Sequence, residues 1–173
     1  SVAVALIIWN FTNDKKQTLA GLFHDIATPV FKHTIDFMNG DYEKQESTEE
    51  ITTQIIANSK EIMELLNRDN IKIDEVNDYH KYPIADNDTP QLSSDRLEYT
   101  LSNGFGVRKQ LWDLDKIKQI YQNIEIQKNE EKIEELGFKD KEIAEEFTKN
   151  MSTLSISYMD GKTKLSMQFL TDI

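Results

Sequence analysis

The sequence predicts a mostly α-helical single domain over residues 1–173, with at most one small β-hairpin. In most segments apolar residues recur three and four positions apart, which is the spacing of one face of a helix. Several of these segments follow a Ser or Asp that is placed to cap a helix. With 173 residues, 38% of them hydrophobic, the chain is long enough to bury one core and short for two full domains.

The N-terminal part of the chain predicts two helices. Residues 2–11 are apolar on nearly every side, as expected of a central helix that is packed all round. Asp14 is placed to cap a second helix. Pro29 disfavours helical geometry at the preceding residue, so we expect this helix to end at Thr28. His24 and Asp25 then lie at the border of its core-facing stripe, which consists of Leu19, Leu22, Phe23 and Ile26.

The middle of the chain predicts further helices and one long loop. Residues 31–38 form a short helix, and Ser47 with Glu50 forms a capping box that starts a long one. Residues 72–76 add a single turn. Residues 78–90 (DYHKYPIADNDTP) are too rich in Pro, Asp and Asn for a regular element, and so long a loop in a compact domain usually has a function. One face of the long helix is expected to carry Ile51, Ile55, Ile62 and Leu66.

The rest of the chain predicts three more helices, a hairpin and a final helix. Ser93 and Ser94 cap a helix that begins at Asp95 and ends near Gly104 and Gly106. Another helix covers residues 113–122, and residues 124–127 and 132–136 form the hairpin. A long amphipathic helix starts at Asp140, and a last helix follows a turn at Asp160 and Gly161. Leu165 and Phe169 indicate this last helix. The apolar faces of the three preceding helices are expected to carry Leu97, Leu101, Leu114, Ile117, Tyr121, Ile143, Phe147, Met151, Leu154 and Tyr158.

Both ends of the sequence look like cuts through structured regions. It starts at Ser1, without an initiator Met, and continues directly into VAVALIIW; it stops equally abruptly in SMQFLTDI. We therefore expect a domain that is truncated at the N-terminus, and the abrupt end is compatible with a truncated C-terminus as well. The apolar run at the start is about eight residues, far short of the roughly 20 that span a bilayer. We expect no contact with a membrane.

Composition limits the chemistry and the partners. The absence of Cys excludes thiolate metal sites, a Cys nucleophile and disulfides, so imidazole and carboxylate groups must do any metal chemistry. This composition is compatible with a reducing compartment, and we expect a cytoplasmic protein. The net charge of −11 disfavours nucleic acid as a partner. Anionic small molecules can still bind, because a divalent cation inverts the local field. The sequence is also compatible with a homo-oligomer.

The adjacent residues His24 and Asp25 are the candidate metal ligands. They offer a neutral nitrogen and an anionic oxygen, a mixture that suits one divalent ion such as Mn, Fe, Ni, Co or Zn, or Mg if waters complete the sphere. Neighbouring helical positions diverge by about 100°, so both side chains reach one ion only where the helix end is shaped for it. A further carboxylate must come from elsewhere. Asp95, which opens its own helix after the long loop, is the best candidate.

Two motifs resemble the HD superfamily of metal-dependent phosphohydrolases. LAGLFHDIATPVFKH is similar to the superfamily's helix through the metal pair, and SSDRLEYTLSN to its later Asp motif. The deoxynucleoside triphosphate triphosphohydrolase branch, which reads HDxGHxPFSH and later DRxxYxxxD, is the most similar. The resemblance covers roughly residues 2–105 and is moderately specific, because the two motifs agree in order and internal spacing. It implies an HD-domain-like helical bundle.

Four positions depart from the pattern of that branch. The superfamily's early His would lie just upstream of Val2, and we expect it to precede the sequence shown. Thr28 stands where the branch has its inner His, which is usually assigned to catalysis. Thr48 stands in place of another His, and Asn103 replaces the usual Asp.

The resemblance implies a role for each residue that matches a motif. His24, Asp25 and Asp95 would bind one divalent ion together with the upstream His. His33 would neutralise phosphate charge or act as a general acid, since its ordinary pKa makes both protonation states accessible. The acidic position of the motif, also catalytic, falls on Asp36. Lys32 and Arg96 would bind phosphate, Tyr99 would stack on or hydrogen-bond a nucleoside, and Asn103 would complete the substrate site.

The leading hypothesis is an HD-type metal-dependent phosphohydrolase that acts on a nucleotide or a similar small phosphate ester through a metal-activated water. The alternative is a catalytically weakened HD domain that binds metal or nucleotide as a regulatory or interaction module; Thr28 and Thr48 favour it. A purely structural helical domain is the third reading. In that case His24 and Asp25 make only local hydrogen bonds, and Asp95 is an acid favoured by the helix dipole. His80, in the long loop, is interpreted as a structural or surface residue.

Overall fold

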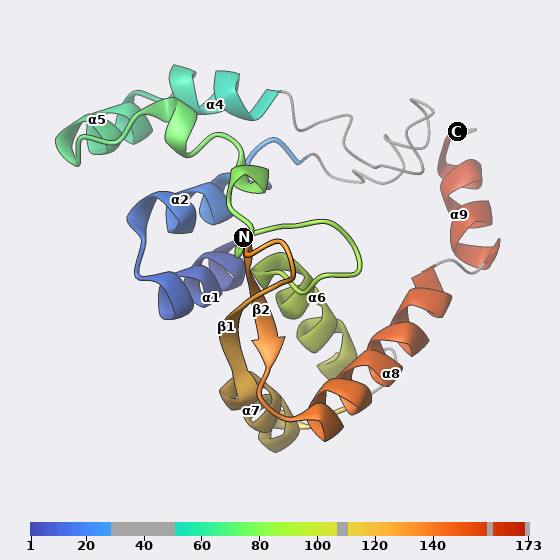
Figure 1. Ribbon diagram of the computed structural model, residues 1–173. Coiled ribbons are helices and arrows are strands. Elements are labelled where there is room, and N and C mark those ends of the chain that lie inside the picture. Colours follow the sequence, from blue (N-terminus) through green and yellow to red (C-terminus); the bar gives the residue numbers. More distant parts are fainter. Residues whose placement is uncertain (29–50, 107–110, 159–160, 172–173) are drawn as a thin grey trace.

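The computed structural model describes residues 1–28, 51–106, 111–158 and 161–171, and in these ranges the protein is mostly helical with one small antiparallel sheet, as predicted (Figure 1). No helix in the described ranges is both long enough and apolar enough to cross a membrane. The elements are α1 (Val2–Thr12), α2 (Lys15–Phe23), α4 (Thr52–Asn58), α5 (Lys60–Arg68), the 3₁₀ turns η2 (Ile73–Glu75) and η3 (Tyr79–Lys81), α6 (Ser94–Phe105), α7 (Leu114–Asn123), β1 (Ile124–Lys128), β2 (Glu134–Phe138), α8 (Lys141–Tyr158) and α9 (Gly161–Thr171).

The first two helices form a tight antiparallel pair. Asn13 leaves α1 in the left-handed conformation with φ of 55°, and Asp14 caps α2 by accepting from the backbone N–H groups of Lys16 and Gln17, at 2.8 and 3.2 Å. Gly21 of α2 lies directly against Ile8 of α1, where a Cβ would collide with the Ile8 side chain. The predicted start of α2 at Asp14 is confirmed.

Helix α1 is buried on two faces rather than on all of them. Val4 and Ile8 pack with Tyr79 in one cluster, and Ile7 belongs to the larger core around α6. The prediction of a helix packed nearly all round is wrong for a third face, because α2 and α6 cover only two sides of it. That third face remains exposed in the structure and carries Val2, Leu6 and Trp9.

The larger core lies between α6, α7, the hairpin and α8. Trp112 is its largest side chain: its indole Nε1 donates to the Leu101 carbonyl at 3.0 Å, and its ring stacks on Phe147 of α8 with centroids 5.9 Å apart. Leu97 and Leu101 of α6 are buried here, as predicted. Leu114 is not: although predicted to face the core, it is exposed, because Ile120 takes the fully buried position of α7.

The predicted hairpin is present. Strands β1 and β2 pair antiparallel, with Ile126 opposite Leu136. Its loop is ordered by Asn129, whose side-chain oxygen accepts from the backbone N–H groups of Glu131 and Ile133 at 3.0 Å each. Leu136 also forms an isolated antiparallel bridge with Leu92, immediately before the cap of α6. The hairpin is therefore tied to the segment that leads into α6.

The long helix predicted through residues 51–66 is divided in two. Ser59 adopts an extended ψ of 107°, ends α4 and caps α5, with its hydroxyl accepting from the Ile62 N–H at 3.3 Å. The predicted face is also wrong in α4, where Ile56 is fully buried and Ile55 is 36% exposed. The predicted helix over 31–38, the capping box of Ser47 and Glu50, and Asp160 of the last turn lie outside the described residues.

Substituting Gly104 tests how tightly α6 packs on Trp112. A Cβ at this position would overlap the indole ring, which is buried and hydrogen-bonded. We expect Gly104→Ala to lower the free energy of unfolding by about 1–3 kcal/mol through overpacking, despite the gain of about 1 kcal/mol in helix propensity. Urea unfolding measures the difference. Gly161→Ala, where a Cβ meets nothing within 4 Å, is the control; equal stability of the two variants would contradict the packing described.

Candidate functional site

The side chains of His24, Asp25 and Asp95 lie together, although Asp95 is far from the other two in sequence. His24 Nε2 is 2.9 Å from Asp25 Oδ2 and 3.6 Å from Asp95 Oδ1. The His24 side chain is 7% exposed, whereas those of Asp25 and Asp95 are 41% and 30% exposed. A buried imidazole therefore points its outer nitrogen at two carboxylates that solvent can reach.

The end of α2 explains how adjacent residues can face the same point. The α-helix ends at Phe23, not at Thr28 as predicted, and residues 24–27 form turns. The Ile26 N–H donates to the Phe23 carbonyl at 2.8 Å, and the Thr28 N–H donates to the Asp25 carbonyl at 2.9 Å. Consecutive side chains of an α-helix diverge by about 100°. The tighter turn lets His24 and Asp25 meet.

His24 is fixed in orientation by two contacts. Its Nδ1 lies 2.7 Å from the Gly21 carbonyl, which can only accept, so Nδ1 carries a proton. Its ring stacks on that of Tyr79, with centroids 4.7 Å apart and planes 27° apart. Metal-bound histidines commonly have one ring N–H held in this way by a carbonyl or carboxylate, which directs the other nitrogen toward the ion.

Asp95 is placed by the start of α6. Ser93 caps this helix by accepting from the Arg96 N–H at 3.2 Å, and the Asp95 N–H donates to the Ala85 carbonyl at 3.2 Å. The buried Ser94 donates its hydroxyl to the Ile84 carbonyl at 2.7 Å. Asp95 is thus anchored to residues 84 and 85 of the long loop.

The three side chains change one another's affinity for protons. Burial alone would lower the pKa of His24, but hydrogen bonds to Asp25 and Gly21 and the charges of Asp25 and Asp95 outweigh it, so this pKa is raised. The hydrogen bond from His24 holds the pKa of Asp25 well below its usual range. The pKa of Asp95 is raised, chiefly by burial and also by the nearby negative charges of Asp86 and Asp25. The positive charge of His24 acts in the opposite direction. The site therefore has two carboxylates beside one imidazole, and this excess of negative charge favours the binding of a cation.

The long loop brings a second histidine close to this group. His80 packs its ring on Tyr79, with centroids 4.4 Å apart, on a side chain that also stacks on His24. Its Nδ1 is 3.0 Å from Asp78 Oδ1, and its Nε2 is 3.5 Å from Asp86 Oδ2. Tyr79 was not predicted as part of the site. The unusual length of its loop was the one signal in the sequence that pointed to this region.

The other predicted site residues are distributed differently. Arg96 points its guanidinium into the long loop, and Tyr99 is half-buried one turn further along α6. Asn103 is exposed on the same helix, about 12 Å along the axis from Asp95 at 1.5 Å per residue. Thr28 donates its hydroxyl to Asp25 at 3.2 Å. Lys32, His33 and Asp36 lie outside the described residues, so their predicted roles stay predictions.

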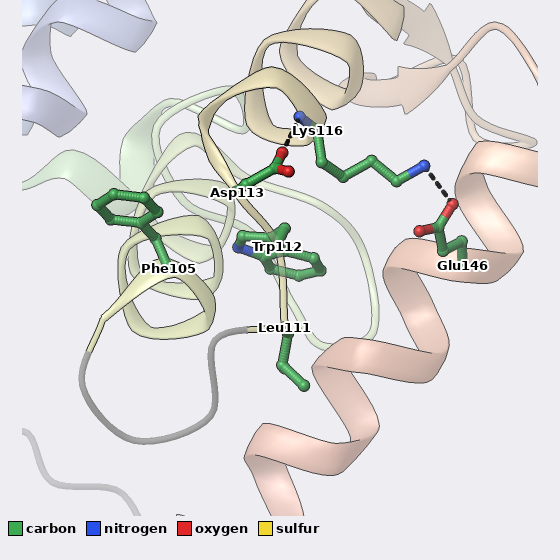
Figure 2. A pocket seen from close by; sticks show the side chains of 6 residues that line it. All are labelled: Phe105, Leu111, Trp112, Asp113, Lys116 and Glu146. Atoms are coloured by element: carbon green, nitrogen blue, oxygen red, sulfur yellow. Dashed lines mark hydrogen bonds and ion pairs between the residues drawn. The ribbon is translucent and has the colours of Figure 1, made fainter.

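A pocket of about 530 Å³ lies elsewhere, at the far end of α6 (Figure 2). Figure 2 shows Lys116 of α7 reaching Glu146 of α8, with 2.6 Å between Nζ and Oε2, beside Trp112. None of the predicted site residues lines this pocket. Lys116 and Glu146 already pair with each other, and Asp113 accepts from the backbone N–H of Lys116, so the group of side chains at His24 is the better candidate site.

The donor set at His24 fits a divalent cation, although the donors are not arranged around one. Among the described residues, no group of three or more His, Asp or Glu side chains stands ready to hold a metal ion. His24 Nε2 makes a direct hydrogen bond to Asp25, which a cation bound to both side chains would have to replace. One imidazole nitrogen and two carboxylates are ligands typical of Mn, Fe, Ni, Co or Zn, and partial exposure leaves room for water.

Comparisons with known proteins do not assign a family. The chain is 28% identical over 102 residues to the uncharacterized protein YdhJ of Bacillus subtilis (strain 168), and the match covers 58% of this chain and 31% of that protein. The chain thus spans less than a third of the length of this curated relative. No family model matches the chain, and no solved structure matches it.

Replacing Asp25 tests the electrostatics of the site in the metal-free protein. Because Asp25 raises the pKa of His24 through a hydrogen bond and its charge, Asp25→Asn should lower that pKa. The raised pKa stabilises the native state at pH values below the ordinary pKa of His, and this contribution disappears as pH rises through the folded value. The same hydrogen bond lowers the pKa of Asp25, and this second contribution disappears as pH falls through the folded value of Asp25. The variant should therefore lose stability mainly at mildly acid pH, between the ordinary pKa values of Asp and His. An NMR pH titration of His24 measures the shift; an unchanged pKa would contradict the hydrogen bond.

Proposed function

We propose that this protein is a metal-dependent phosphohydrolase of the HD type, acting on a nucleotide or a similar small phosphate ester. The observation that carries the proposal is the meeting of His24, Asp25 and Asp95 from two distant segments, with Nε2 of the histidine directed at both carboxylates. These are the residues that match the two motifs of the resemblance. The match to YdhJ of Bacillus subtilis adds no activity, because that protein is itself uncharacterized.

In this proposal the residues of the site have separate tasks. His24, Asp25 and Asp95 hold one divalent cation, and the Gly21 carbonyl keeps the His24 proton on Nδ1, so that Nε2 can bind. When bound, such a cation lowers the pKa of a water and polarises a phosphoryl oxygen. Tyr99, half-buried four residues after Asp95, is the described side chain best placed on α6 to contact a nucleoside. His33, Lys32 and Asp36 retain the tasks that the motif suggests.

The alternative is a catalytically weakened HD domain that binds metal or nucleotide in a regulatory role. Thr28 favours it, because a threonine hydroxyl at this position donates to Asp25 at 3.2 Å and cannot act as a histidine acid or base near neutral pH. Both functions use the same metal ligands. They differ in whether the bound phosphate ester is turned over.

Metal binding can be tested without a substrate. Elemental analysis of purified wild-type protein should find a bound divalent transition metal, or bound manganese after the protein is incubated with Mn²⁺. We expect Asp25→Ala and Asp95→Ala to lose it while the circular dichroism spectrum stays helical, because both carboxylates are partly exposed and neither is a core residue. Asp115→Ala, at a carboxylate that is 93% exposed on α7, is the matched control. Equal metal content in Asp95→Ala and wild type would remove Asp95 from the site.

Turnover separates the two functions. The full-length protein is incubated with Mn²⁺, Mg²⁺, Fe²⁺, Ni²⁺ or Co²⁺ and with a panel of nucleotides and a generic phosphodiester, and released phosphate or nucleoside is measured. We expect hydrolysis that depends on the added metal and falls at least about a hundredfold in Asp25→Ala, since the loss of a metal ligand removes the charge stabilisation that the ion supplies. Binding of metal without turnover of any substrate would favour the regulatory function.

A further inference from the structure

Arg96 is bound on several sides by the long loop. Its Nη1 donates to the side-chain oxygen of Asn87 at 2.7 Å and to the Gln91 carbonyl, and its Nη2 donates to the Asn87 carbonyl at 2.7 Å. Nη2 is also 3.4 Å from Asp86 Oδ1, and the arginine side chain is 12% exposed. The planar guanidinium group thus cross-links Asp86 and Asn87 of the loop, and Gln91 directly after it, to the first turn of α6.

The same loop touches both parts of the candidate metal site. Tyr79 stacks on His24 at one end of the loop. Toward its other end, the Ala85 carbonyl accepts from the N–H of Asp95 itself. The loop thus contacts both segments that carry the residues of the candidate site.

We infer that Arg96 is a positioning residue that fixes the loop over residues 84–91 and thereby holds Asp95 at the distance from His24 that a shared cation needs. This inference rests on the proposed function. It replaces the expectation that Arg96 binds phosphate, because both terminal nitrogens of the guanidinium, Nη1 and Nη2, are already engaged by Asn87, Gln91 and Asp86.

Lysine would separate the two roles of this side chain. A phosphate contact mainly needs a positive charge, which lysine supplies. The loop contact needs a rigid planar fork that reaches a side-chain oxygen and two carbonyls at fixed angles, and a lysine ammonium on a flexible stem does not reproduce it. Arg96→Lys therefore keeps the charge and removes the geometry.

The test is isothermal titration of the metal-free full-length protein with Mn²⁺ alone. We expect Arg96→Lys to weaken Mn²⁺ binding roughly 10-fold or more, as is typical when a group that orients a metal ligand is lost. Asn87→Ala removes one acceptor from the other side of the contact and should weaken binding in the same direction, by less. Arg68→Lys, at an exposed arginine whose Nε pairs with Asp69, should leave the affinity unchanged.

Each result decides between the roles. If Arg96→Lys binds Mn²⁺ as tightly as the wild type does, the inference is overturned. If Arg96→Lys fails to fold, an unchanged Mn²⁺ affinity in Asn87→Ala overturns it instead. A phosphate ligand would instead leave the Mn²⁺ affinity intact in both variants. If the wild type itself takes up no Mn²⁺, the proposed function fails and the inference fails with it. The wild-type titration thus tests the proposed function. The ratio of the Mn²⁺ affinity of each variant to that of the wild type tests the inference.

Discussion

Helix α1 has two buried faces, and through them it packs against both helices that adjoin the candidate site. One face packs through Ile8 on Gly21 of α2, and the other contributes Ile7 to the core that contains α6. A helix with one buried face would hold α2 or α6, not both. Helix α2 ends at Phe23, directly before His24, and α6 begins at Ser94, directly before Asp95. Because α1 packs against both helices, a histidine and a carboxylate from remote segments lie 3.6 Å apart.

Most of the fold was predictable from local chemistry. Asp14 and Ser93 start helices because their side chains satisfy backbone N–H groups that a helix leaves open, and this is a property of a few neighbouring residues. The break at Ser59 was not predictable, since a serine can lie inside a helix or cap the next one and only packing selects between them. The same holds for the outer face of α1, where an apolar sequence does not reveal which sides receive a neighbour.

The sequence indicated which residues come together at the candidate site, but not the residues that support them. The order and spacing of two motifs indicated His24, Asp25 and Asp95. The contacts of Tyr79 and Arg96 depend on the path of an irregular loop, which no periodic pattern describes. An arginine in a motif is compatible with an anionic ligand as well as with backbone carbonyls as its partner. Only the structure shows that Asn87 and Gln91 supply its acceptors.

The bridge between Leu92 and Leu136 has a consequence for the order of folding. Leu92 directly precedes the cap of α6, whereas Leu136 belongs to a hairpin formed much later in the sequence. Contacts of such separation carry a larger loop-closure cost than those within the pair α1 and α2. During synthesis the histidine half of the site can therefore be structured while the support of its aspartate half still waits for the hairpin. Segments that contribute no side chain to the candidate site thus govern when it is complete.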